Sequence, residues 1–285
     1  MAKVYQCGGR KRGVCFHESE VRWIGRCESC KRYYDILIKG SDETKSKSSL
    51  ASLAEKEIKR ISTGIAEVDK VLGGGMVPGS SIVISGPPGG GKSTLLLTIA
   101  NNVATEKHPV LYTSGEQSRE DIAIMAKRIN ALSDNVEVLG NNGDAYEITK
   151  KAEDIKASLV IVDSIQTAYL DDSESAEGSA QQVKDTINYL TAWCKREKII
   201  MFIISQVDKK GDLAGPNAMA HLCDIVTEMD PYTVYDDDGE LDERTKNWKM
   251  LSSGKNRYGA SGVSELLEMT ESGIKPVKKK SKLEI

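Results

Sequence analysis

Residues 81–97, "SIVISGPPGGGKSTLLL", constrain the fold of this chain more than any other stretch. An apolar run typical of a buried strand leads into a glycine-rich loop, and the loop leads into a leucine-rich segment typical of a helix. Gly86 is followed, after four residues, by Gly91, Lys92 and Ser93, which is the P-loop pattern in its expected context. A strand, loop and helix in this order predict a sheet covered by helices, with a phosphate-binding site where the strand meets the helix.

The remaining pattern between residues 58 and 274 repeats this alternation. Apolar runs typical of strands in a parallel sheet alternate with amphipathic segments of helical period. The strands are expected at 81–86, 109–115, 136–140, 159–164 and 199–205, and the helices at 92–106, 118–132, 145–155 and 180–197. The segments 246–259 and 264–277 are typical of antiparallel edge strands, preceded by an acidic turn at 235–243. We predict an α/β fold with a mostly parallel sheet.

The loop residues fit the chemistry of a nucleoside triphosphate. Glycines let backbone N–H groups wrap around phosphates, Lys92 can reach the β- and γ-phosphate oxygens, and the Ser93 hydroxyl can hold Mg²⁺. Asp163 follows a buried apolar strand, where a carboxylate is costly without a cation nearby, so it is the second candidate for Mg²⁺. The predicted cofactor-binding residues are Gly86, Gly89, Gly90, Gly91, Lys92, Ser93, Thr94 and Asp163.

Two further polar residues end predicted strands and are candidates for catalysis. Glu116 is the candidate base that orients and deprotonates water beside the P-loop. Alternatively, its negative charge could stabilise the N-terminus of the next helix by interacting with the helix dipole. Gln206 is the candidate sensor of the γ-phosphate, with a plain strand-end hydrogen bond as the alternative. Lys209 and Lys210 then fall in a basic loop that contains Gly211.

The first 40 residues form a separate, basic, cysteine-rich module. Four of the six cysteines, Cys7, Cys15, Cys27 and Cys30, fall within the first 30 residues, which favours a local Zn²⁺ site over disulfides. Cys7 and Cys15 are separated by seven residues, so the loop between them must fold outward, and His17 is an alternative ligand to Cys15. A module this small with little aliphatic core would need a metal to fold. Cys194 and Cys223, in apolar contexts, are expected to be buried thiols.

Composition supports four segments: a zinc finger at 1–40, a polar linker at 41–57, the ATPase domain at 58–274 and a basic tail at 275–285. The net charge of −3 conceals basic ends on an acidic middle, since residues 1–40 carry nine Lys or Arg against four Asp or Glu. Basic surfaces favour a polyanionic partner, although a solvated tail is the simpler explanation for the last residues. The sequence has no long apolar run and no signal-peptide pattern, so we expect a cytoplasmic protein with no membrane partner.

Several motifs together resemble the bacterial RadA/Sms family of RecA-fold ATPases. They are "ISTGIAEVDKVLGGGMVPGS", "YTSGEQS", "VIVDSIQT", "DLAGPNAMAHLCDIV", "KNRYG" and, near the start, "RWIGRCESC". The resemblance runs from about residue 5 to about residue 277. It implies an ATP-driven motor of DnaB type that forms a hexameric ring on single-stranded DNA and promotes branch migration in recombination and repair, with a recombinase or replisome protein as a possible partner of the zinc finger.

The resemblance also assigns a role to the cations of "KNRYG". Lys255 and Arg257 resemble the pair that one subunit supplies to the nucleotide of its neighbour, where a cation stabilises charge on the transferring phosphoryl group. The alternatives for this pair are contact with DNA phosphates and a solvated strand edge. The resemblance also places Lys209 and Lys210 in a loop that contacts DNA phosphates in the ring channel, with an ordinary solvated loop as the alternative. The sequence departs from the family pattern at Ser205-Gln206, Asn217 and Tyr258, and it ends where the usual Lon-like domain would begin.

Two other functions fit the same motifs. A phage replicative helicase of DnaB type would share the ATPase domain and would be separated from branch migration by strand unwinding in a reconstituted replisome. A nucleotide-switched recruitment module would bind ATP to set the ring state without translocation. The combination of Glu116, Lys255 and Arg257 favours a hydrolysing motor over the recruitment module.

Overall fold

The structure is a computed structural model that describes residues 58–171, 175, 179–206, 221–235 and 238–277, together with the backbone of three short strands nearer the N-terminus. Two compact units can be distinguished, Met1–Ile58 and Lys59–Ile285. The first contains β1 (Val4–Cys7), which pairs antiparallel with both β2 (Glu18–Ser19) and β3 (Ile36–Lys39). The side chains of this unit lie outside the described residues.

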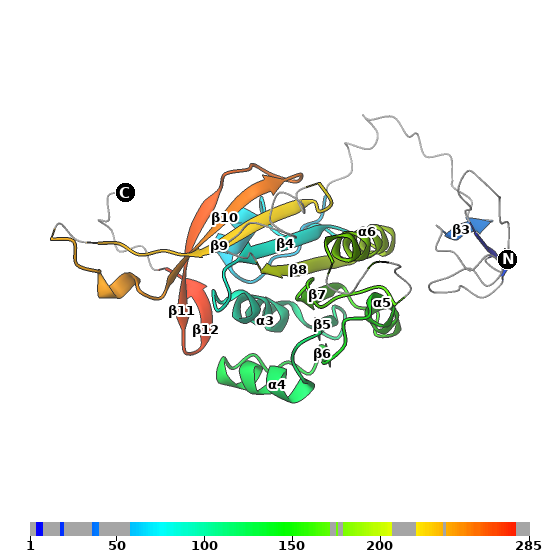
Figure 1. The fold of residues 1–285 in the computed structure, drawn as a ribbon, viewed down its shortest axis with the longest axis horizontal. Coiled ribbons are helices and arrows are strands. Elements are labelled where there is room, and N and C mark those ends of the chain that lie inside the picture. Colours follow the sequence, from blue (N-terminus) through cyan, green and yellow to red (C-terminus); the bar gives the residue numbers. More distant parts are fainter. Residues whose placement is uncertain are drawn as a thin grey trace. The chain divides into compact units, whose positions relative to one another are not determined.

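The second unit is built on a nine-stranded sheet in the order β12-β11-β10-β9-β4-β8-β7-β5-β6 (Figure 1). The strands from β4 to β9 pair in parallel, whereas β10, β11 and β12 extend the sheet antiparallel beyond β9. Their bounds are β4 (Ser81–Gly86), β5 (Val110–Ser114), β6 (Val136–Leu139), β7 (Leu159–Asp163), β8 (Ile200–Gln206), β9 (Ile225–Pro231), β10 (Trp248–Asn256), β11 (Ser264–Thr270) and β12 (Gly273–Pro276).

Helices cover both faces of the sheet because successive side chains of a strand point to opposite faces. In β4, Ile82 and Ile84 join the core cluster that contains Leu95, Leu96 and other residues of α3, while Val83 joins the cluster that contains residues of α5 and α6. The helices are α2 (Ala66–Val71), α3 (Lys92–Val103), α4 (Arg119–Arg128), α5 (Ala145–Asp154) and α6 (Ala180–Glu197), with a short 3₁₀ turn, η1 (Glu243–Thr245). The predicted α/β class with a mostly parallel sheet is confirmed.

The sheet contains elements that the sequence pattern did not reveal. The strand β9 lies between β4 and β10, yet its sequence "IVTEMDP" carries two acidic residues and does not stand out as a buried run. The segment 264–277 forms a hairpin of two strands, β11 and β12, which bends back at residues 271–272 toward α3. Both differences lie beside the P-loop and so affect the shape of the site.

The prediction about the two later cysteines can be compared directly with this unit. Cys194 and Cys223 are both buried free thiols, as predicted, and burial raises the pKa of each to about 12. In the portion of the chain that the structure describes, none of the helices has both the length and the apolar character needed to cross a membrane.

Candidate functional site

The phosphate-binding loop follows the central strand β4 and leads into α3. Gly86 ends the strand with φ 146°, and a side chain there would collide with the Met229 carbonyl oxygen. Gly91 is the N-cap of α3 with φ 97°, and a side chain there would collide with the Met269 methyl group. Glycine is required at both positions, by backbone conformation and by close packing. The loop is therefore held tightly between β9 and the β11–β12 hairpin.

The Lys92 side chain lies inside this loop. Only 5% of Lys92 is exposed, and its ammonium donates hydrogen bonds to the carbonyl oxygens of Gly86 at 2.9 Å and Pro87 at 2.8 Å. Burial lowers the pKa of Lys92, and the nearby carboxylates of Asp163 and Asp230 oppose that shift. A cation held among backbone groups at a helix N-terminus is suited to an anion such as a polyphosphate.

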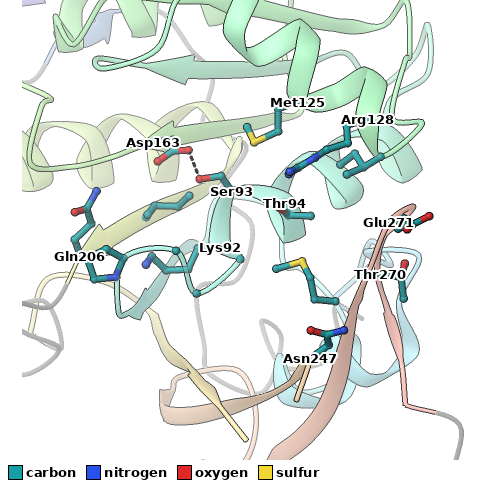
Figure 2. A pocket seen from close by; sticks show the side chains of 17 residues that line it. Lys92, Ser93, Thr94, Met125, Arg128, Asp163, Gln206, Asn247, Thr270 and Glu271 are labelled. Carbon is teal, nitrogen blue, oxygen red and sulfur yellow. Dashed lines mark hydrogen bonds between the residues drawn. The ribbon is translucent and has the colours of Figure 1, made fainter. Parts of the chain in front are cut away.

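Ser93 and Asp163 meet across the carboxyl edge of the sheet. The Ser93 hydroxyl, in the first turn of α3, donates to Asp163 Oδ2 at 2.6 Å, as the dashed line in Figure 2 shows. The Tyr112 hydroxyl, from β5, donates to the same oxygen at 2.6 Å. At a P-loop, Mg²⁺ is bound by a Ser or Thr hydroxyl and held, directly or through water, by a nearby carboxylate. Ser93 and Asp163 therefore fit the predicted metal.

A pocket of about 860 Å³ opens beside the loop. At one end lie Gly89, Gly90, Gly91, Lys92, Ser93, Thr94, Asp163 and Gln206, which were all predicted from the sequence. At the other end Met125 and Arg128 of α4 face Asn247, Thr270 and Glu271 (Figure 2). Ile129, the C-cap of α4, and Met269 also line the pocket. No sequence motif marks this second group, because it combines a helix and a hairpin more than 100 residues apart.

Glu116 lies near the metal-binding pair without lining the pocket. Strands β8 and β7 separate β5 from β4, so Glu116 does not lie directly beside the P-loop. Its Oε1 accepts a hydrogen bond of 3.4 Å from the hydroxyl of Ser164, the residue after Asp163. Its side chain is exposed, which leaves it accessible to water. The role of Glu116 as a base stays a prediction.

Gln206 is tied to the loop after β7 through another glutamine. The Gln166 side-chain amide donates to the Gln206 carbonyl oxygen at 3.1 Å and accepts from the Gln206 N–H at 3.4 Å. Gln206 lines the pocket beside Lys92 (Figure 2). This arrangement joins the ends of β7 and β8 at the pocket. The sequence singled out Gln206, whereas Gln166 was seen only as part of a longer motif.

Lys255 and Arg257 lie at the amino ends of the parallel strands, whereas the P-loop lies at their carboxyl ends. The Lys255 ammonium donates to the Cys223 carbonyl oxygen at 2.8 Å, and Arg257 Nη1 lies 2.8 Å from Asp224 Oδ1. These partners directly precede β9, whose Ile225 pairs with Ile82 near the start of β4. The P-loop follows the far end of β4, which is about 20 Å away for a strand of this length.

Asp224 is a buried carboxylate that the sequence analysis missed. Its Oδ2 accepts from the Ser81 N–H at 3.1 Å and the Ser81 hydroxyl at 3.0 Å, and its Oδ1 pairs with Lys195 at 3.1 Å and with Arg257. Burial alone would raise the pKa of Asp224, but the Ser81 N–H, Lys195 and Arg257 together lower it. Asp224 therefore holds Arg257 at the start of β4.

Other predicted site residues cannot be placed. Lys209 and Lys210 lie outside the described residues, as do Cys15, Cys27, Cys30 and the alternative ligand His17. For Cys7 only the backbone, in β1, is described. Among the side chains that the structure does describe, no group of three or more His, Cys, Asp or Glu could hold a metal ion. The zinc site and the DNA-binding loop stay predictions.

Comparisons with known proteins agree with this geometry. Residues 46–212 match the family described as AAA domain. The chain is 34% identical to the DNA repair protein RadA of Haemophilus influenzae over 276 residues, and 34% identical to that of Escherichia coli over 274 residues. These alignments cover 91% and 90% of this chain but 57% of each relative, so the chain spans less than two thirds of the relatives' length.

A solved structure shows the same fold at low sequence identity. The KaiC-like protein PH0186 from Pyrococcus horikoshii OT3 superposes with a TM-score of 0.61 at 17% identity. The match covers 78% of this chain and all of that protein. At this identity the likeness is evidence for the fold alone.

We predict that Asp224→Asn destabilises the protein by about 1–3 kcal/mol, because a buried carboxylate with charged donors is lost while the exposure of Lys195 and Arg257 limits the effect. Chemical denaturation at neutral pH measures this loss. Because the folded pKa is lowered, the Asp224 contribution is present above the unfolded pKa of about 3.9 and is lost as pH falls through the folded pKa. The variant should therefore lose less stability on acidification.

Glu243→Gln is the matched control, since it removes one carboxylate from an exposed ion pair with Lys246. The control should unfold at the wild-type denaturant concentration. Equal stability of Asp224→Asn and wild type would show that the carboxylate does not organise this edge of the sheet.

Proposed function

Because this chain belongs to the bacterial RadA/Sms family, we propose that it is a Mg²⁺-dependent ATPase that acts on single-stranded DNA in recombination and repair. The observation that carries the proposal is the meeting of Lys92, Ser93 and Asp163 at one end of the pocket. Branch migration by a translocating ring is the specific activity proposed, and it is consistent with relatives named DNA repair protein RadA.

Different residues of the pocket would bind different parts of ATP. Backbone N–H groups of the loop and the start of α3 surround the phosphates, and the Lys92 ammonium exchanges its carbonyl partners for phosphate oxygens. Ser93 and Asp163 would hold Mg²⁺, and the metal would supply positive charge that shields the phosphates during transfer. Arg128 and Asn247, at the other end of the pocket, would be available to the rest of the nucleotide.

Hydrolysis needs a group that accepts a proton from water. The bond between the γ-phosphorus and the bridging oxygen of ADP breaks, a bond from water to that phosphorus forms, and the water proton passes to Glu116. Ser164 orients the Glu116 carboxylate through their hydrogen bond and links it to the residue beside Asp163. At 3.4 Å this hydrogen bond is long, which suits a base whose hydrogen bonds shorten once substrate is bound.

A second subunit would complete the site. Lys255 and Arg257 lie at the amino end of β4 and cannot reach the P-loop of their own chain, which supports their action on the nucleotide of a neighbour. A head-to-tail arrangement in which each chain gives these cations and receives another pair closes naturally into a ring. We propose a hexamer of this kind, with Asp224 holding Arg257 in place for the neighbouring subunit.

Sensing of DNA would pass through Gln206. Its side chain faces the phosphate end of the pocket, and its backbone is joined to Gln166, so a change at the γ-phosphate would move the ends of β7 and β8 together. Lys209 and Lys210 follow in sequence and would contact DNA phosphates without reading bases.

The N-terminal module would bind Zn²⁺ through Cys7, Cys15, Cys27 and Cys30 and contact DNA or a recombinase or replisome protein. Metal analysis of the protein purified without added zinc would detect about one Zn²⁺ per chain. A zinc-free preparation whose N-terminal unit is fully folded would contradict this part of the proposal.

Glu116→Gln should lower the rate of ATP hydrolysis by roughly 10²–10⁴-fold, because the amide cannot accept a proton, while ATP binding changes little. Steady-state phosphate release and a fluorescent-ATP binding assay measure the two quantities separately. Glu120→Gln, an exposed change in the first turn of the following helix, serves as the control and should leave both unchanged. Full turnover by Glu116→Gln would remove Glu116 from the mechanism.

Mixing two inactive variants tests the shared site. Arg257→Ala should reduce hydrolysis by roughly 10³-fold or more, and Lys92→Ala should abolish nucleotide binding in its own subunit. A 1:1 mixture should recover roughly a quarter of wild-type activity, since one interface in four pairs an intact P-loop with an intact arginine in a random ring. Native mass spectrometry checks that the variants co-assemble. Mixed rings without recovered activity would show that Arg257 does not act across the interface.

A further inference from the structure

The Tyr112 hydroxyl contacts the carboxylate of the proposed metal site, although no role for Tyr112 was predicted from the sequence. Tyr112 is 0% exposed in the middle of β5, and its ring belongs to the core cluster on the α3 face of the sheet. Its hydroxyl nevertheless donates to Asp163 Oδ2 at 2.6 Å, next to the Ser93 hydroxyl on the same oxygen. A buried hydroxyl needs a hydrogen-bond partner, and the partner of this one is the carboxylate at the proposed metal site.

We propose that Tyr112 is a positioning residue for the magnesium site. Its hydroxyl fixes the Asp163 carboxylate in the orientation needed to hold magnesium through a water molecule. This inference rests on the proposed ATPase function and adds a residue to its metal site. Tyr112 acts through Asp163 and does not itself line the pocket.

The hydrogen-bond geometry gives the reason. A carboxylate oxygen accepts along two lone-pair directions, and Oδ2 of Asp163 already receives one hydroxyl from α3 and one from β5. Among the described residues none donates to Oδ1, so Oδ1 would be the oxygen available to a hydration water of the metal. Two donors from different elements prevent the carboxylate from rotating about its Cβ–Cγ bond, which is how outer partners orient metal ligands.

The chemistry of the phenol suits this role, because its O–H donates the hydrogen bond that holds the Asp163 carboxylate. A neutral phenol donates to a carboxylate and is a poor ligand for Mg²⁺ itself. Tyr112 thus supports the first ligand shell without entering it.

Tyr112→Phe removes only the hydroxyl and keeps the ring that packs in the core. We expect the Mg²⁺ concentration at half-maximal binding of a fluorescent ATP analogue to rise roughly tenfold, with binding in EDTA close to wild type. Electron paramagnetic resonance of bound Mn²⁺ provides a second readout independent of hydrolysis, and it should show weaker Mn²⁺ binding. Both titrations are run well below the melting temperature of the variant, so that a loss of stability does not enter them.

Tyr189→Phe is the matched control. Its hydroxyl lies 3.1 Å from Thr149 Oγ1 between α5 and α6, on the other face of the sheet. This control should show the wild-type Mg²⁺ midpoint whatever its melting temperature. A wild-type midpoint in Tyr112→Phe, with normal Mg²⁺-dependent binding in the wild type, would overturn the role of Tyr112 alone. Wild-type protein that binds ATP without any dependence on Mg²⁺ would overturn the proposed metal site as well.

Discussion

The burial of the Lys92 ammonium at the end of the central strand is the constraint on which the site depends. A cation withdrawn from water needs oxygen partners, and the loop after β4 supplies them from the Gly86 and Pro87 carbonyls. The loop can take this shape only with glycines at its two ends, and the hairpin β11–β12 and strand β9 pack directly against it. The antiparallel extension of the sheet is therefore part of the nucleotide site as well as of the core.

The two ends of β4 carry opposite buried charges, and their separation is the basis of the proposed two-subunit site. Lys92 and its partners lie at the carboxyl end, while Asp224 lies at the amino end and holds Arg257. Each end is satisfied locally within the chain. A neighbouring chain placed with its Arg257 edge against the carboxyl end of this one would bring the two halves of the proposed active site together.

The sequence predicted the elements that have strong local patterns and missed those that depend on distant contacts. The strand, loop and helix around Lys92 carry their own spacing, so their bounds agree with the structure to within a few residues. Strand β9 contains Glu228 and Asp230 and is stabilised by pairing with β4 and β10, which no local pattern records. Tyr112 and Asp224 were missed for a similar reason, because their partners lie 51 and 143 residues away.

The rate of ATP hydrolysis by the purified protein in Mg²⁺, with and without single-stranded DNA, is the most direct measurement of the proposed function. A motor in which Gln206 and the following loop link DNA to the γ-phosphate predicts strong stimulation by DNA, and removal of Mg²⁺ should abolish the activity. Hydrolysis at the same rate with and without DNA would contradict the motor, and would favour a protein that uses ATP to recruit a partner.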